Sequence, residues 1–178
     1  MVAEVCIFCE IVRGKQPASI VWEDELVLAL IDPRQFHAGH TLVMPRRHLG
    51  DVRELDYTTG AALMALVACV TRAVATTFPN QGLSLWHSIG PAADQEVPHL
   101  HIHVHPRQIG DDLLRIYPSV ATSPDRQTLD RYAALLRALS AKIRSKPNQR
   151  SSGRAMCRVP DLFLCPARPM LGNRIAPL

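Results

Sequence analysis

This chain has few aromatic side chains and no hydrophobic run of membrane-spanning length. Phe, Trp and Tyr make up 5% of its 178 residues. No apolar stretch approaches the roughly 20 residues that a transmembrane helix needs, and no basic-then-apolar signal peptide opens the sequence. We therefore expect a cytoplasmic protein without a membrane partner, in which the five cysteines stay reduced.

Basic residues are not in excess over acidic ones outside the C-terminal segment. Six basic residues against one aspartate give residues 146–178 a charge of +5, whereas the whole chain carries +4. Residues 1–145 are thus close to −1, which does not indicate a nucleic-acid partner. The segment 146–178 holds five prolines and no sustained hydrophobic period. We expect it to be a disordered or loosely docked tail that follows one catalytic domain at 1–145.

Hydrophobic periodicity predicts an α+β fold for residues 1–145. Apolar positions recur at helical spacing in two segments, which predicts main helices over 56–78 and 124–145. Runs of β-forming residues bounded by turn signals predict strands at 18–24, 27–32, 41–45, 82–88 and 99–105. Trp86 in the fourth of these runs is expected in the core.

Four histidines alternate with Leu, Ile and Val over residues 99–105. This register predicts a strand with one apolar face and one imidazole face. A row of imidazoles suits metal binding, or nucleophilic and acid–base chemistry near neutral pH. A cluster of solvated edge histidines is the alternative without a function.

The pair Cys6 and Cys9 is ambiguous among a redox motif, half of a zinc site and coincidence. A redox pair normally follows β structure, and none precedes this one. His48 and His99 are candidates for the two further ligands of a tetrahedral zinc site. The alternative is two reduced cysteines and a histidine without a role.

Several further motifs occur at characteristic spacing around these residues. They are Val21-Trp22-Glu23-Asp24, Asp32 after an apolar run, the segment 39–48, and Gln95-Glu96-Val97-Pro98 directly before the histidines. In this order the chain resembles the histidine triad (HIT) family of nucleotide hydrolases and transferases over roughly residues 4–118. The resemblance implies an antiparallel sheet with helices packed against it, usually paired as a homodimer. It also implies cleavage of a nucleoside 5′-phosphate from a leaving group through a nucleotidyl-histidine intermediate.

Catalytic roles follow from the same resemblance. His101 is the expected nucleophile, and His103 is expected to contact the α-phosphate. His40 would orient the triad, and Gln95 would contact the phosphate or the leaving group. Neutral imidazole attack divides one difficult displacement into two easier ones.

The resemblance also implies positions for a purine nucleotide and for a structural zinc ion. Asp32 matches the residue that holds the ribose hydroxyls, Phe8 and Leu30 would lie near the base, and Ser88 replaces a hydrogen-bonding asparagine. The zinc ligands of many bacterial members correspond to Cys6, Cys9, His48 and His99.

Two positions depart from the family pattern, and the substrate stays open. Asp94 stands where glycine is common, and its carboxylate would repel phosphate unless it turns away. His105 occupies the last hydrophobic position. Phosphoramidates and dinucleoside polyphosphates are both compatible with the sequence. A nucleotide-binding regulator with negligible turnover is an alternative, and a hydrolase with metal on His101, His103 and His105 is disfavoured because one strand carries all three.

Overall fold

The computed structural model describes residues 6–113 and 123–145, with side chains only as far as residue 138 in the last helix. The chain divides into two compact units, one that ends at Leu113 and one that begins at Leu114. In the second unit the described element is α3 (Arg126–Ser145), which agrees with the helix predicted over 124–145. The predicted tail at 146–178 lies outside the described residues, and the division at 145 stays a prediction.

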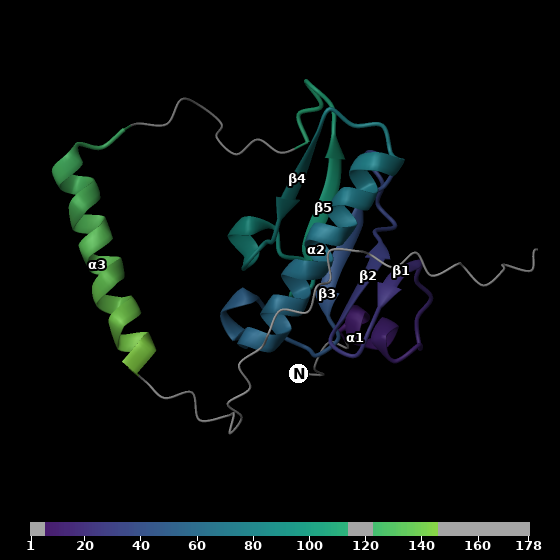
Figure 1. Cartoon of the computed structure of the whole chain (residues 1–178), viewed down its shortest axis with the longest axis horizontal. Helices are drawn as coiled ribbons and strands as arrows, with labels where there is room; N and C mark the ends of the chain where they lie inside the picture. Colours follow the sequence, from purple (N-terminus) through teal and green to yellow (C-terminus); the bar gives the residue numbers. More distant parts are fainter. Residues whose placement is uncertain (1–5, 114–122, 146–178) are drawn as a thin grey trace, which may run out of the picture. The chain divides into compact units, whose positions relative to one another are not determined.

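The first unit is built on a five-stranded antiparallel sheet (Figure 1). The strands are β1 (Ile20–Glu23), β2 (Val27–Ile31), β3 (Thr41–Pro45), β4 (Gly82–Trp86) and β5 (Ile102–Arg107). They lie side by side in the order β1-β2-β3-β5-β4. The α+β prediction is confirmed, and the histidine-bearing strand β5 lies between β3 and the edge strand β4.

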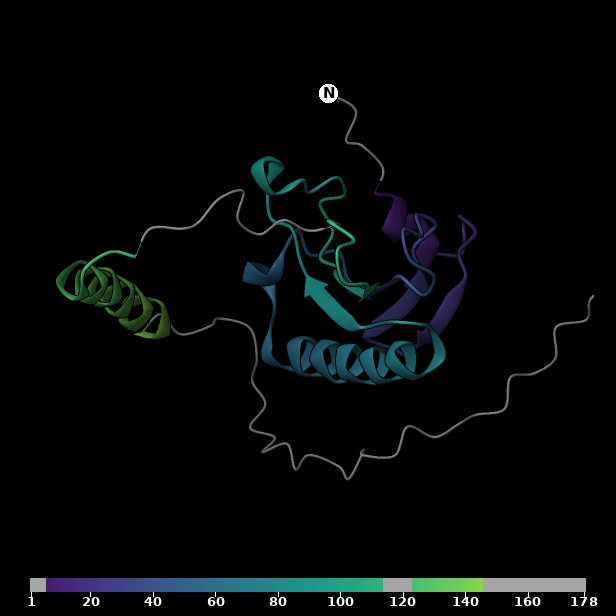
Figure 2. The same cartoon turned by 90° about the horizontal axis from the view of Figure 1, so that it is seen from above.

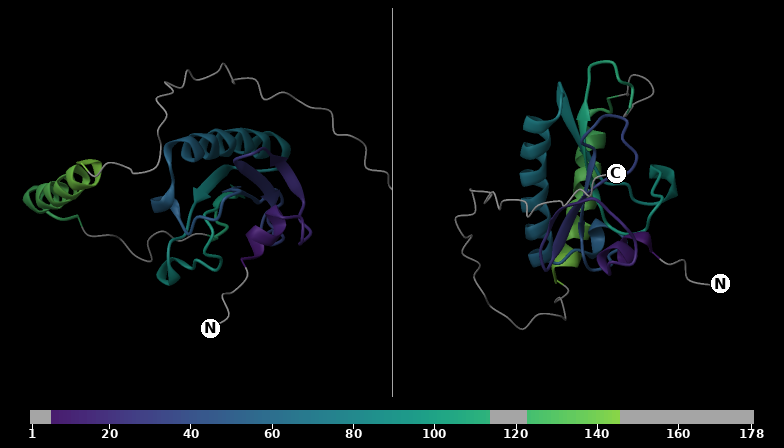
Figure 3. Two further views of the ribbon diagram at one scale, coloured as in Figure 1. Left: turned by 90° about the horizontal axis from the view of Figure 1, so that it is seen from below. Right: turned by 90° about the vertical axis from the view of Figure 1, so that its right-hand side faces the viewer.

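Helices cover both faces of this sheet. The long helix α2 (Tyr57–Thr77) runs along one face, and the short helix α1 (Ile7–Val12) lies on the opposite side (Figures 2 and 3). Two 3₁₀ helices, η1 (Val52–Glu54) and η2 (Pro91–Ala93), lie in the connections before α2 and before β5. Neither α1 nor the 3₁₀ helices was predicted, because each is shorter than two full turns.

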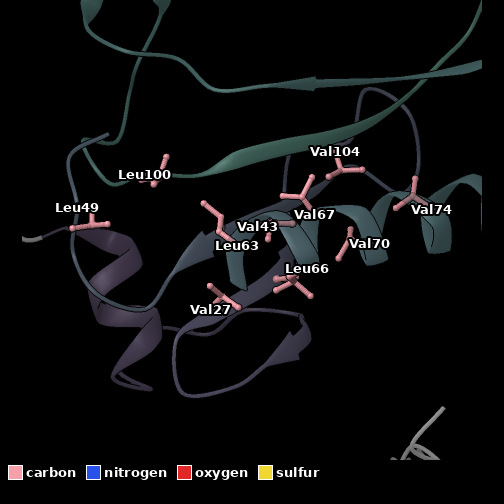
Figure 4. Packing of buried hydrophobic residues seen from close by; sticks show 11 residues of the cluster. Val27, Val43, Leu49, Leu63, Leu66, Val67, Val70, Val74, Leu100 and Val104 are labelled. Carbon is pink, nitrogen blue, oxygen red and sulfur yellow. The ribbon is translucent and has the colours of Figure 1, made fainter. Parts of the chain in front are cut away.

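The helix α2 supplies half of the main core. Asp56 caps its N-terminus by accepting a hydrogen bond from the Thr59 backbone N–H at 2.9 Å. Its buried side chains pack against sheet residues such as Val43 and Val104 (Figure 4). By length and composition α2 could cross a membrane, a test that core helices of soluble proteins also pass. The expectation that no segment reaches this length is therefore wrong for α2.

Successive side chains along each strand point to opposite faces of the sheet. In β2, Val27 belongs to the core under α2, whereas Leu28 and Leu30 pack with Phe8 of α1 on the other face. Both sets are buried, so β2 and β3 are covered on both faces along almost their whole length. In β5 the apolar member of each pair points to α2, which leaves the imidazoles on the face that carries α1.

The histidine strand is shifted from its predicted position at 99–105. It begins at Ile102 and ends at Arg107, so His99 and His101 precede the ladder. The Leu100 N–H donates to the Leu49 carbonyl at 2.6 Å, outside the sheet. The pairing partner β3 reaches only as far as the pair Val43 and Ile102. The alternation of histidine with apolar residues therefore begins before the strand itself.

Candidate active site and metal-binding cluster

A backbone carbonyl fixes the tautomer of His101. The Nδ1 atom of its ring lies 2.6 Å from the His99 carbonyl oxygen. A carbonyl only accepts, so Nδ1 carries the hydrogen and Nε2 of the neutral ring holds a lone pair. Burial lowers the pKa of His101, which keeps the ring neutral near pH 7. The edge-to-face contact with Phe8, at 5.1 Å between ring centres, adds to this burial. His101 therefore has the protonation state of a nucleophile.

His103 is hydrogen-bonded to His40 in a buried chain that ends at Asp32. His40 donates from Nδ1 to the Arg34 carbonyl at 2.9 Å, and its Nε2 lies 2.9 Å from Nδ1 of His103. The Asp32 carboxylate lies 3.6 Å from the same His40 Nδ1. Burial, followed by the neighbouring His101 and His40, lowers the pKa of His103 to about 3. The Asp32 carboxylate therefore lies on the His40 side of this pair.

The indole of Trp86 stacks on His103. Their ring centres are 4.3 Å apart and the ring planes differ by 4°. Trp86 and His103 are direct cross-strand partners of β4 and β5, and the indole is only half-buried. The expectation that Trp86 belongs to the core is therefore wrong. The pairing register of β4 and β5, which the sequence alone does not specify, is what brings Trp86 to the site.

Two cavities share the wall residue Asp32, and histidines line the second of them. The first has a volume of about 570 Å³, and Phe8, Leu30 and Asp32 are among its mostly apolar lining residues. The second has a volume of about 460 Å³, and its lining includes the rings of Trp86 and His103. Both cavities contain Asp32 and one further residue, Arg34, in their walls. Three of the residues predicted for the nucleotide thus line one cavity.

The other two predicted polar contacts occupy different places. Gln95 accepts a hydrogen bond from the Gly90 N–H at 2.8 Å and donates to the Gly50 carbonyl at 3.0 Å. Its amide therefore ties the η2 loop to the segment before η1. Ser88 follows β4 and lines neither of the two cavities.

Asp94 closes η2 in the left-handed conformation, with φ 56° and ψ 38°. Glycine is favoured at such a position because it has no Cβ. The backbone conformation therefore explains why glycine is common at this position in the family pattern. The Asp94 side chain is exposed and lines neither cavity. The carboxylate therefore turns away from both cavities, which is the arrangement that phosphate binding would require of it.

Four side chains that can ligate a metal lie together at the N-terminal end of α1. One ligand atom from each of Cys6, Cys9, His48 and His99 lies within 4.8 Å of the others. The Nδ1 atom of His99 is 3.5 Å and 3.6 Å from the two sulfurs, and Nδ1 of His48 is 3.3 Å from Cys9. Tetrahedral zinc, with bonds of about 2.0–2.3 Å, holds its ligand atoms roughly 3.3–3.8 Å apart. The cluster fits such an ion.

The tautomer of His99 also suits metal binding. Its Nε2 donates to the Pro45 carbonyl at 2.9 Å, which leaves the Nδ1 lone pair facing the two cysteines. A second group, Asp32 with His40 and His103, meets the same distance criterion. There, both ring nitrogens of His40 are already hydrogen-bonded. The cysteine-containing cluster is therefore the better metal site.

His105 is the fourth imidazole of the run and is 1% exposed. Its Nδ1 donates to the Pro106 carbonyl at 2.6 Å, and burial lowers its pKa. Within the part of the chain that the structure describes, neither metal-ligand cluster contains His101 or His105. Among these described residues, His101, His103 and His105 do not meet in one cluster, which is what the metal-dependent alternative would require.

A HIT domain matches residues 13–109, which is more than half of the chain. The chain belongs to the HIT family.

Relatives within the HIT family extend from bacteria to fungi. Protein hit of Bacillus subtilis is 40% identical over 105 residues, which cover 59% of this chain and 72% of that protein. The adenosine 5′-monophosphoramidase hnt1 of Schizosaccharomyces pombe is 32% identical over 142 residues, which cover 79% and 97%. A crystal structure of a HIT family member from Bacillus subtilis is similar, with a TM-score of 0.71 and 32% identity, and covers 76% of this chain and 96% of that one. The HIT family therefore accounts for the sheet, the helices and the histidine run.

Proposed function

We propose that this HIT protein hydrolyses purine nucleoside 5′-phosphates joined to a leaving group, with His101 as the covalent nucleophile. The observation that carries the proposal is the hydrogen bond from His101 Nδ1 to the His99 carbonyl at 2.6 Å. It leaves Nε2 unprotonated on a ring that burial keeps neutral. A relative named as an adenosine 5′-monophosphoramidase supports the same reaction class.

The reaction would proceed in two displacements at phosphorus. The His101 Nε2 lone pair forms a bond to the α-phosphorus while the bond to the leaving group breaks, and the leaving group departs with a proton. Water then attacks the phosphoramidate and releases the nucleoside monophosphate and His101. A proton on the His40–His103 pair would give His103 an Nε2–H that donates to the phosphate oxygens. The Asp32 carboxylate beside His40 would balance that charge.

The larger cavity is the proposed nucleoside site. Its apolar wall includes Phe8, Leu30 and Val97, which suits a flat base, and Asp32 offers a carboxylate to ribose hydroxyls. Its volume of about 570 Å³ lies in the usual range for small-molecule sites.

We also propose a structural zinc ion on the cluster of Cys6, Cys9, His48 and His99. The donor set of two thiolates and two imidazoles is typical of closed, tetrahedral zinc sites. Zinc there would hold α1 against the segments that carry His48 and His99. It would take no part in the displacement at phosphorus.

A second copy of the chain is the proposed partner of the β4 edge. This strand ends the sheet, and Leu85 on it is 48% exposed. On α2, Met64 and Tyr57 are also exposed. Apolar side chains beside an open strand edge favour pairing of two sheets. Sedimentation velocity tests this by the mass of the particle, and a monomer at micromolar concentration would contradict it.

Intact-protein mass spectrometry after an acid quench tests the covalent step. Wild-type protein mixed with an adenosine phosphoramidate should carry an adenylyl adduct, and His101→Ala should lose both the adduct and turnover. His37→Asn is the control, because His37 lines neither cavity, and it should keep the adduct. Comparable release of AMP by His101→Ala would refute the assignment.

A further inference from the structure

Arg34 lies where the two cavities meet. Among the described residues that line either cavity, it is the only lysine or arginine. Burial lowers the pKa of His103 and of His105 in the wall of the second cavity, so these rings are neutral near pH 7. Arg34 therefore supplies a permanent positive charge where the walls of the two cavities meet.

The backbone of Arg34 is fixed to the catalytic residues. Its N–H donates to the Asp32 carboxylate at 2.8 Å, and its carbonyl accepts from His40 at 2.9 Å. The backbone of Arg34 is thus anchored beside the triad, whereas the Arg34 side chain is 68% exposed. The guanidinium is therefore able to move while the Arg34 backbone keeps its position relative to His40 and His103.

The guanidinium is held by Glu96 and also lies beside Asp32, whose carboxylate is 3.8 Å from its Nε. The NH1 group donates to both carboxylate oxygens, at 2.9 Å and 2.8 Å. The Glu96 side chain is 65% exposed, and such solvent-exposed ion pairs contribute little to stability. An anion that arrives in the cavity would compete with Glu96 at a small cost.

The larger cavity suits the nucleoside, so the leaving group belongs on the other side of the phosphate. The second cavity, with Trp86 and His103 in its wall, is the space available there. We propose that Arg34 leaves Glu96 and binds an anionic group on the leaving portion of the substrate. The protein then prefers substrates whose leaving group carries a carboxylate, a sulfate or a phosphate. This inference rests on the proposed hydrolase function and specifies its substrate class.

A matched pair of substrates isolates this charge. Adenosine phosphoramidates of β-alanine and of β-alaninamide differ by one carboxylate and release AMP by breaking the same P–N bond. We expect a higher kcat/KM for the β-alanine compound. Arg34→Gln should lower the ratio of the two kcat/KM values about tenfold, because a charged hydrogen bond to the leaving group is lost. Adenosine 5′-phosphosulfate serves as a third substrate with a tetrahedral anion.

Three further variants separate this role from a structural one. Glu96→Gln should raise the ratio, because it frees the guanidinium. Arg34→Lys keeps the positive charge but lacks the forked donors of the guanidinium. Its ratio should lie between those of wild type and Arg34→Gln. Arg46→Gln is the control, because its ion pair with Glu23 lies outside both cavities, and the ratio should not change.

The outcomes distinguish this inference from the function on which it rests. If Arg34→Gln changes neither this ratio nor the kcat/KM for the phosphosulfate, with wild type active, the role of Arg34 is overturned and the hydrolase proposal stays intact. A loss confined to the phosphosulfate, or to the β-alanine compound, upholds the role and identifies the preferred anion. If wild type cleaves none of the three substrates, the proposed function fails and this inference fails with it.

Discussion

Backbone carbonyl groups determine what each site histidine can do. The carbonyl of His99 faces Nδ1 of His101, so His101 presents Nε2. The carbonyl of Pro45 faces Nε2 of His99, so His99 presents Nδ1. Two imidazoles that are two residues apart in one run therefore have opposite tautomers. One tautomer suits attack at phosphorus and the other suits a metal ion beside two thiols.

Asp94→Gly should stabilise the protein. The residue has φ 56°, where a Cβ is unfavourable, so glycine should raise the free energy of unfolding by about 0.5–1 kcal/mol. Urea denaturation measures the change. The neighbouring Ala93 has a negative φ, and Ala93→Gly should destabilise instead. A large gain in kcat/KM for Asp94→Gly would contradict the placement of its side chain outside both cavities.

The residue-level partners at the site could be predicted only in part. The alternation of histidines with apolar residues suffices to place His101 and His103 on one face. The ion pair between Arg34 and Glu96 joins residues 62 apart in sequence, and no local pattern announces such a contact. The stack of Trp86 on His103 depends on the register of two strands, which their separate sequences do not specify.

At the scale of elements, α1 is the least autonomous part of the first unit. It has six residues, far fewer than an isolated helix needs to be stable in water. Its buried side chain is Phe8, and Cys6 and Cys9 connect it to His48 and His99. The sequence could not reveal this helix, because its stability comes from tertiary contacts that lie some 40 and 90 residues away.

Loss of a cluster ligand should therefore loosen α1. Cys6→Ser should lose the bound metal and lower the free energy of unfolding by roughly 3 kcal/mol, since metal binding to the folded state is then absent. Elemental analysis and thermal unfolding measure the two effects. Cys69→Ser is the matched control, because Cys69 lies on α2 outside the cluster, and its metal content should match wild type. A Cys6→Ser protein that retains its full metal content would exclude this set of ligands.

Over the first unit as a whole, the sheet separates an apolar core from a site rich in imidazoles. The alternation of apolar residues in the strands and their helical spacing along α2 predicted this division. Both patterns are set by burial along a continuous stretch of sequence. Three of the site-face histidines, His87, His103 and His105, have a pKa below the usual value, in each case mainly through burial. The folded unit therefore binds fewer protons than the unfolded chain below about pH 6.5.

Acid should destabilise the protein before its carboxylates are titrated. Unfolded histidines take up protons that the folded state excludes, so the free energy of unfolding falls as pH decreases from 7 to 5. Each such histidine contributes up to about 1.4 kcal/mol per pH unit. Urea denaturation at pH 7, 6 and 5 measures the slope. His105→Leu should reduce the slope by about one proton, and an unchanged slope would mean that His105 titrates normally in the folded state.

The position of β5 between β3 and β4 has a consequence for insertions and deletions. Its side chains alternate between the α2 core and the face with the cavities, so the loss of one residue would exchange the two sets. Imidazoles would then enter the apolar core, and valine and isoleucine would face the phosphate. Changes in length are therefore tolerable only in the loops around this strand. Variation within it is restricted to substitutions that keep each side chain on its own face, as His105 does.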